Sequence, residues 1–346
     1  MNDIMSKNID ELEQVMKDYG ENKFRAKQVF EWLHNKMVLN YEQMSNLPKK
    51  LIEQMKRDYP IETMKIVKKY ESKIDGTIKY LFELKDSHII ESVLMRYKHG
   101  NSVCISTQVG CHMNCAFCAS TLEGLVRNLT PGEMVSQIYH IAKDTGEKVT
   151  HVVMMGSGEP LERLDYTCRF IELINCDKGQ NIGQRHLTLS TCGIVPNIIE
   201  LANKKLQITL AVSLHASDND KRKSIMPIAN KYSIQQLLDA CRYYTEKTGR
   251  RITFEYALID KENDTPEDAR KLGKLLRGML CHINLIPVNA IEERNYKGSP
   301  QTNIDRFIKI LEQEYNIDTT LRRKLGADID AACGQLRRRY VVNRGE

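Results

Sequence analysis

Three cysteines stand close together in the stretch GCHMNCAFCAS, residues 110–120: Cys111, Cys115 and Cys118. Three thiolates are one too few for a closed structural zinc site, and no second C-x2-C pair matches them elsewhere in the chain. A 4Fe–4S cluster held by three thiolates leaves one iron open to another ligand. The spacing therefore favours an iron–sulfur cluster with an open corner over zinc, or over three cysteines packed in a turn.

The composition is that of a globular protein. The chain has 346 residues, of which 41% are hydrophobic and 28% charged, enough for one large domain and a smaller one. No apolar run approaches the roughly 18 residues of a membrane span, and the start MNDIMSKNIDELEQ lacks the pattern of a secretory signal. We therefore expect a cytoplasmic protein with no membrane partner.

The numbers of cysteines and of charged residues indicate which kinds of site and partner to expect. Ten cysteines in such a chain are more typical of metal ligands, catalytic thiols and core residues than of disulfides. The formal net charge of +6 permits a nucleic-acid partner without requiring one.

A small helical domain and a β-meander linker precede the cysteine motif. Residues 1–60 predict helices, because FRAKQVFEWLHNKMV carries apolar residues at helical spacing and NIDELEQVMKDYG ends at Gly20. Residues 61–96 contain short β-type runs split by turn signals such as Asp75-Gly76.

Strands and helices alternate from there on. Strand candidates are 102–108, 151–155, 186–191, 207–214, 252–258 and 281–287. Helical stretches follow near 131–145, 162–175, 195–203, 233–248, 266–278 and 302–315. Six such βα units predict an α/β fold with a parallel sheet, either doubly wound or barrel-like. Active sites of these folds lie at the carboxyl ends of the strands, where the cysteine motif also falls.

The C-x3-C-x2-C spacing, with Phe117 before the last cysteine, resembles the signature of the radical S-adenosylmethionine (SAM) superfamily. This resemblance implies a 4Fe–4S cluster on Cys111, Cys115 and Cys118, with SAM on the open iron. It also implies cleavage of SAM to a 5′-deoxyadenosyl radical. The expected fold is then a partial (β/α)6 radical SAM barrel, which the βα units fit.

Longer blocks are similar to the RlmN/Cfr family of RNA adenine methyltransferases, and their wording is closer to the RlmN branch. They are SVCISTQVGC, CASTLEGLVRNLTPGEM, RHLTLSTCGIVP, RITFEYALID, CHINLIPVN and DIDAACGQLR. The similarity extends over about residues 20–338. It implies methylation of adenine C2, in 23S rRNA near the peptidyl-transferase centre and, for dual-specificity members, beside the tRNA anticodon.

The resemblance assigns catalytic roles to two further cysteines. Adenine C2 is electron-poor, so the family uses two SAM molecules: one methylates Cys333, and the radical from the second takes a hydrogen atom from that methyl group. Cys104 is implied as the resolving thiol, which forms a transient disulfide with Cys333. Glu91 matches the position of the proton acceptor, although the thiolate of Cys104 could also serve.

The resemblance also implies a set of SAM contacts at the strand ends. They are Gly158, Glu159, Ser190, Ser213, Leu214, His215 and Asn289. Ser157 stands where the family commonly has Met, which leaves open how the chain packs against SAM at this point.

The implied division is an RNA-binding accessory domain at 1–60, the linker at 61–96, a radical SAM core at 97–330 and a C-terminal segment at 331–346. The last segment carries Cys333 and a basic tail. Lys68, Lys69 and the tail, Arg337–Arg339, are candidates for RNA phosphate contacts. The implied partners are 23S rRNA, tRNA and an electron donor such as flavodoxin or ferredoxin, and nothing suggests more than a monomer.

Two other functions remain open at this point. A Cfr-type enzyme would methylate adenine C8, and a ribosomal antibiotic-resistance phenotype would distinguish it. A non-methylating iron–sulfur RNA-binding protein would be favoured by loss of Cys104 or Cys333, and both are present.

Overall fold

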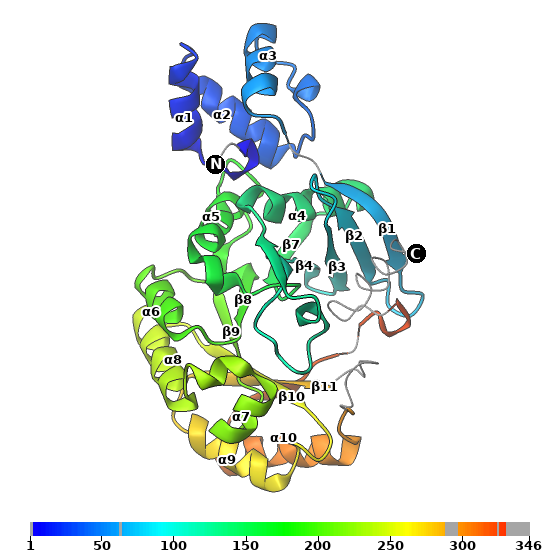
Figure 1. The fold of residues 1–346 in the computed structure, drawn as a ribbon, viewed down its shortest axis with the longest axis vertical. Coiled ribbons are helices and arrows are strands. Elements are labelled where there is room, and N and C mark those ends of the chain that lie inside the picture. Colours follow the sequence, from blue (N-terminus) through cyan, green and yellow to red (C-terminus); the bar gives the residue numbers. More distant parts are fainter. Residues whose placement is uncertain (1–2, 62–63, 288–296, 324, 330–346) are drawn as a thin grey trace.

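The computed structural model describes residues 3–61, 64–287, 297–323 and 325–329. Within this part, one sheet of ten strands runs in the order β1-β2-β3-β4-β7-β8-β9-β10-β11-β12. Helices cover its outer face, and a small helical domain stands at one end (Figure 1). No helix of the described part is long and apolar enough to cross a membrane.

The N-terminal helical domain comprises α1 (Ile9–Asp18), α2 (Phe24–Phe30) and α3 (Lys49–Asp58). α1 begins at a capping box, in which the side chains of Asn8 and Glu11 accept hydrogen bonds from each other's backbone amides. The apolar faces of the three helices are buried, as their helical spacing predicts.

Polar contacts fix this domain to the outside of the barrel. Thr130 is the N-cap of α4 (Pro131–Thr145), and its hydroxyl donates to a carboxylate oxygen of Asp3 at 2.7 Å. The buried ring of His34 lies 2.9 Å from the hydroxyl of Tyr139, which α4 also carries. The domain therefore rests on the barrel through specific contacts.

The predicted meander forms antiparallel strands that join the main sheet. β1 (Lys65–Glu71), β2 (Ile78–Glu83) and β3 (Ile89–Tyr97) pair in sequence, and β3 pairs with β4 (Gly100–Cys104). β4 then pairs in parallel with β7 (Val149–Met154). The meander thus extends one edge of the barrel sheet.

The remaining strands are parallel and alternate with outer helices, which confirms the predicted partial barrel. The strands are β8 (Leu187–Thr191), β9 (Thr209–Ser213), β10 (Ile252–Leu258) and β11 (Cys281–Pro287). The helices are α5 (Leu164–Asn175), α6 (Val195–Asn203), α8 (Ile234–Thr248), α9 (Pro266–Leu276) and α10 (Gln301–Tyr315). A continuous apolar core lies between the sheet and these helices.

The structure corrects one predicted strand and adds short elements. The strand expected at 102–108 ends at Cys104, because the carbonyl of Ile105 accepts from the amide of Gly156 rather than from a strand. The elements that the sequence did not indicate are β5 (Gln108–Gly110), β6 (Leu125–Asn128), α7 (Asn219–Ile225) and β12 (Thr319–Leu321). Each has seven residues or fewer, too few to show a periodic pattern.

Candidate active site at the carboxyl ends of the strands

A pocket of about 530 Å³ opens at the carboxyl ends of the parallel strands, a volume suited to a small-molecule cofactor. Most of the residues singled out from the sequence line it: Cys104, Cys111, Cys115, Cys118, Gly158, Glu159, Ser190, Ser213 and His215. Leu214 and Glu91 are buried and are not among the lining residues. Asn289 and Cys333 lie outside the described residues.

Backbone contacts fix the loop that carries the three clustered cysteines. Gly110 has φ +76°, and a Cβ there would overlap the carbonyl oxygen of Gly124. That carbonyl accepts from the amide of Cys111 at 2.9 Å. Farther along the loop, the amide of Ala116 donates to the carbonyl of Ile225 at 2.8 Å, at the end of α7. The loop is therefore held from both sides.

The chemistry of this loop fits an iron–sulfur cluster better than a single metal ion. Within the described ranges, no three His, Cys, Asp or Glu side chains are placed to hold one metal ion. A cubane cluster does not need such a group, because each of its thiolates binds a different iron atom. Burial, with the neighbouring thiols, raises the pKa of Cys111 to about 12 and also raises that of Cys115. Bound iron would supply the positive charge that thiolates need here.

Gly158 and Glu159 follow β7 and face the cysteine loop. A Cβ on Gly158, which has φ +116°, would lie 2.6 Å from the Oγ1 of Thr107. The carboxylate of Glu159 accepts from the amides of Leu161 at 2.9 Å and Cys192 at 2.7 Å. Burial raises the pKa of Glu159, and these backbone hydrogen bonds oppose the shift. A cationic group placed against this carboxylate would offset the cost of burying its charge.

His215 is held as a neutral imidazole on the opposite side of the loop. Its Nδ1 accepts from the amide of Ala257 at 2.9 Å, so the ring proton is on Nε2. Burial, assisted by the nearby Arg222, lowers the pKa of His215 to about 3. Its ring meets that of Phe117 edge-on, with centroids 4.5 Å apart. His215 therefore supports the cysteine loop and presents a donor.

Glu91 lies on the barrel-facing side of β3, next to the pocket. Glu91 lies on the same face of the strand as Val93 and Met95, which are two and four residues farther along and line the pocket. Its carboxylate lies 3.1 Å from the ammonium of Lys79 on β2, and both side chains are almost fully buried. Glu91 is therefore enclosed in the sheet and is not an exposed surface carboxylate.

Ser157, which stands in the place of the usual Met, is directed at the cysteine loop. Its hydroxyl lies 3.0 Å from that of Ser120, just after the last cysteine of the motif. Its amide donates to the Oγ of Ser106 at 3.1 Å. Ser157 therefore links two loops and is not among the lining residues of the pocket.

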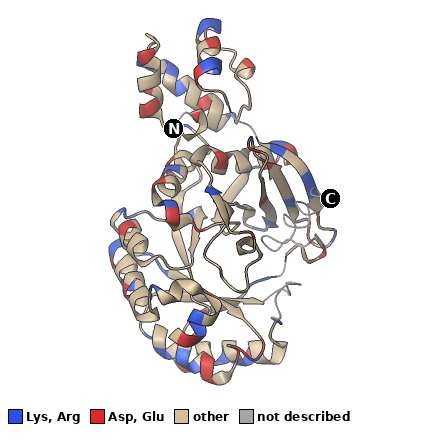
Figure 2. Cartoon of the chain, viewed as in Figure 1, with Lys and Arg blue, Asp and Glu red and all other residues tan. Residues whose placement is uncertain are grey.

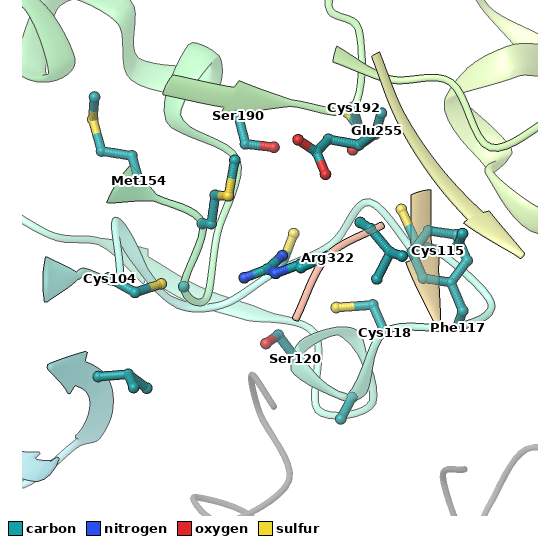
Figure 3. A pocket seen from close by; sticks show the side chains of 18 of the residues that line it. Cys104, Cys115, Phe117, Cys118, Ser120, Met154, Ser190, Cys192, Glu255 and Arg322 are labelled. Atoms are coloured by element: carbon teal, nitrogen blue, oxygen red, sulfur yellow. The ribbon is translucent and has the colours of Figure 1, made fainter. Parts of the chain in front are cut away.

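Sequence reasoning did not assign three charged residues of the pocket, Glu255, Arg322 and Arg323. Figure 3 shows Arg322 between Cys104 and Cys118, and Glu255 on the side of Ser190 and Cys192. Burial raises the pKa of Glu255 to about 7, and Arg322 and a hydrogen bond from Asn284 oppose the shift. A lone carboxylate within the apolar strand ITFEYAL was the available signal, since strands of a barrel interior rarely bury an acid without a purpose.

The outer face of the helical domain, which was expected to bind RNA, is mixed in charge. Lysines and arginines alternate with acidic residues over these helices and the meander (Figure 2). Lys69 pairs with Asp144 at 2.9 Å, and the ammonium of Lys68 lies over the ring of Tyr70. Arg337–Arg339 lie outside the described residues.

Comparisons with known proteins agree with this geometry. Residues 105–273 match the family model described as Radical SAM superfamily, and residues 2–61 match the Ribosomal RNA large subunit methyltransferase N-terminal domain. A "Probable dual-specificity RNA methyltransferase RlmN" of Clostridium perfringens is 54% identical over 345 residues, covering 100% of this chain and 99% of its own.

Two further relatives extend the comparison. A protein of the same name from Clostridium beijerinckii is 56% identical over 341 residues, covering 99% of this chain and 96% of its own. The crystal structure of a radical SAM methyltransferase from Sphaerobacter thermophilus is similar with a TM-score of 0.92 and 41% identity, covering 96% of this chain and 98% of that one.

Proposed function

Because this chain belongs to the RlmN family of radical SAM RNA methyltransferases, we propose that it methylates C2 of a specific adenine in 23S rRNA and of the adenine beside the anticodon in some tRNAs. One observation carries this proposal. The cysteine loop, Cys104 and the Gly158-Glu159 pair face a single pocket at the strand ends. The cofactors of the family, a 4Fe–4S cluster and two SAM molecules per turnover, fit the chemistry of that pocket.

The cysteine loop would hold the cluster, which supplies the electron that cleaves SAM. Glu159 is suited to receive the ammonium of SAM, since its buried carboxylate lines the pocket and backbone amides hold both of its oxygens. The missing side chain of Gly158 leaves room for close approach of the backbone, and Ser190 and Ser213 add hydroxyls to the same wall. Leu214 contributes backbone only, because its side chain points into the core.

Cys104 and the proposed methyl carrier, Cys333, would act on the other side of the pocket. Cys104 is 4% exposed, at the end of β4, and packs against Val93 and Met95. A thiol in this position can attack the sulfur that holds the base, which releases the product and leaves a Cys104–Cys333 disulfide. Glu91, buried beside Lys79, is the proposed acceptor of the C2 proton.

The proposal includes partners that the pocket itself does not define. A base inside folded RNA must be turned out of its stack to enter the pocket. The N-terminal domain and the meander are proposed to contact RNA phosphates. An electron donor of the flavodoxin or ferredoxin class would reduce the cluster, and we propose a monomer that acts on RNA in the cytoplasm.

The first test identifies the product. The protein is reconstituted anaerobically with iron and sulfide and incubated with SAM, a reductant and unmodified rRNA or tRNA. Digestion and mass spectrometry against 2- and 8-methyladenosine standards then identify the methylated carbon. We expect 2-methyladenosine from both RNAs. 8-Methyladenosine would assign the C8 activity of the Cfr branch instead, and no modified base with 5′-deoxyadenosine formed would refute the proposed substrate.

A further inference from the structure

A segment near the C-terminus crosses the open side of the barrel. This crossing segment comprises residues 322, 323 and 325–329, and it begins directly after β12, which is one edge strand of the sheet. The amide of Arg322 donates to the carbonyl of Leu285 at 2.8 Å, which fixes its start. Its red end lies beside β1 and β2 at the other edge (Figure 1).

Two aspartates fasten the far end of the crossing segment to the turn between β1 and β2. The carboxylate of Asp328 accepts from the hydroxyl of Ser72 at 2.6 Å and from the amide of Lys73 at 2.9 Å. In return, the carboxylate of Asp75 in the turn accepts from the amide of Gly326 at 2.9 Å. These three hydrogen bonds run in both directions between the turn and the segment, so they fix its register.

The turn is ordered by its own contacts before the segment reaches it. The hydroxyl oxygen of Ser72 accepts from the amide of Ile74 at 3.1 Å, and Asp75 accepts from the amide of Thr77 at 3.0 Å. The same two side chains that shape the turn therefore hold the crossing segment. Hydrogen bonds to the ionised carboxylates are stronger than neutral ones.

The crossing segment also forms one wall of the active-site pocket. Leu325, Gly326 and Ala327 line it. The side chain of Leu325 packs against the group formed by Val93 and Cys104 with their neighbours. The turn thus holds the segment directly over the proposed resolving thiol.

The anchor shortens the free chain that leads to Cys333 and so limits how far Cys333 can reach. Cys333 is four residue steps from Ile329, a distance of at most about 14 Å when the chain is fully extended. If the segment were held only at Arg322, Cys333 would be eleven residue steps from the fixed point, a reach of about 39 Å. The −3/2 power of tether length makes the effective concentration of Cys333 at the pocket about fivefold higher with the anchor.

We propose that Asp75 and Asp328 are positioning residues, which keep Cys333 within reach of SAM and of Cys104. This inference rests on the proposed function of the two cysteines. The anchor acts on the chain that leads to Cys333 and touches neither substrate nor cofactor.

The test compares the double variant Asp75→Ala/Asp328→Ala, which removes all three hydrogen bonds of the anchor, with the wild-type holoenzyme under anaerobic conditions. Protein is incubated with SAM, without reductant or RNA, and peptide mass spectrometry follows S-methylation of Cys333. In this step the thiol sulfur takes the methyl group of SAM, S-adenosylhomocysteine leaves, and the thiol proton passes to solvent. A second assay adds diamide, which takes two electrons and two protons from Cys104 and Cys333 as their disulfide forms. We expect both rates to fall about fivefold in the variant, with its iron content unchanged.

Asp86→Ala is the matched control, because Asp86 lies in the next turn of the same meander and contacts His88 and Arg127 instead. Its two rates should equal those of the wild type. If the double variant fails to fold, Asp328→Ala alone keeps the hydrogen bond from Gly326 to Asp75 and should slow both reactions by a smaller factor.

The outcomes separate the two proposals. Equal rates in wild type and folded anchor variants, with methylation and disulfide both observed, overturn the anchor alone. Absence of methylation and of the disulfide in the wild type overturns the proposed roles of Cys104 and Cys333.

Discussion

The two walls of the pocket are built in different ways. The wall proposed to hold the cofactors comes from strand ends and loops within residues 105–273, and backbone hydrogen bonds and glycines with positive φ fix it. The opposite wall is the crossing segment, whose anchoring hydrogen bonds join residues 251 to 256 positions apart in the chain, in the segment and in the turn between β1 and β2.

This difference suits two different tasks. A cluster and SAM need fixed ligands, because small displacements of reacting atoms are costly in rate. A cysteine that carries a methyl group must face SAM in one step and the base in the next. The crossing segment is held at its end by a few polar contacts. Such segments open at a low free-energy cost, which would allow the cysteine to move from SAM to the base.

The largest expected effect comes from breaking the cofactor wall. Cys118→Ala should abolish cluster binding and all methyl transfer, because the remaining two thiols of the motif cannot hold the cluster. Iron content, visible absorbance and methylated product are measured together. Cys168→Ala, on α5 and outside the pocket, should retain all three. Cluster binding that survives in Cys118→Ala would mean that another residue is the ligand.

Removing Cys104, the proposed resolving thiol, should block product release without affecting the cofactor wall. Cys104→Ala should keep the cluster and add the methylene carbon to RNA, but the product should stay attached to the protein. The covalent protein–RNA adduct is measured by denaturing gel electrophoresis, with nuclease digestion as a check. Cys176→Ala should release its product normally, since Cys176 does not line the pocket. Free 2-methyladenosine from Cys104→Ala at the normal rate would contradict the assigned role.

A side chain at Gly158, in the same cofactor wall, should have a smaller effect than the loss of Cys118 or Cys104. In Gly158→Ala, the new Cβ would meet Thr107 and the side chain of Gln108 at 2.6 and 2.7 Å, in a backbone conformation with φ +116°. We expect weaker SAM binding and a loss of about 1–3 kcal/mol in the free energy of unfolding. Equilibrium dialysis and thermal unfolding measure the two effects.

Gly146→Ala is the matched control for Gly158→Ala. Gly146 also has positive φ, +69°, but a Cβ there would meet no atom within 4 Å. This variant should lose about 1 kcal/mol of stability from the left-handed backbone alone, with SAM affinity unchanged. Equal SAM affinities in the two variants would show that Gly158 has only a structural part.

The helix starts and the cysteine loop of the cofactor wall could be predicted from short sequence patterns. The helical stretches expected near 131–145 and 266–278 begin in the structure at Pro131 and Pro266, each behind a capping box made by Thr130 or Thr265. These signals work because a cap is satisfied within four residues. The cysteine loop was found for the same reason, since its spacing is local.

Features that depend on distant partners could not be predicted in this way. Asp75 was identified only as part of a turn, because its contact with Gly326 has no trace in the neighbouring residues. The burial of Glu91 had no signal in the sequence, because it depends on Lys79 and the adjoining strands. Glu255 lies within the block RITFEYALID but was given no role of its own, because its raised pKa follows from burial in the folded structure.

The smallest expected effect concerns Glu255, which faces Arg322 of the crossing segment from a barrel strand. Its pKa is raised to about 7 in the folded chain, chiefly by burial, against about 4.3 when unfolded. The folded state therefore binds this proton more tightly. The resulting stability is fully present below about pH 4.3 and is lost as the pH rises through 7, on the order of 3 kcal/mol in all.

Glu255→Gln removes this titration but keeps an acceptor for the amide of Asn284. The free energy of unfolding of the wild type, relative to the variant, should therefore fall by roughly 2 kcal/mol between pH 5.5 and 8. Urea unfolding at several pH values under anaerobic conditions measures it, and Glu246→Gln, at an exposed position of α8, should show no such slope. Parallel curves for Glu255→Gln and the wild type would mean that Glu255 stays ionised at pH 5.5. Its charge would then be balanced across the pocket by Arg322, and the two walls would be joined by an ion pair as well as by the anchor.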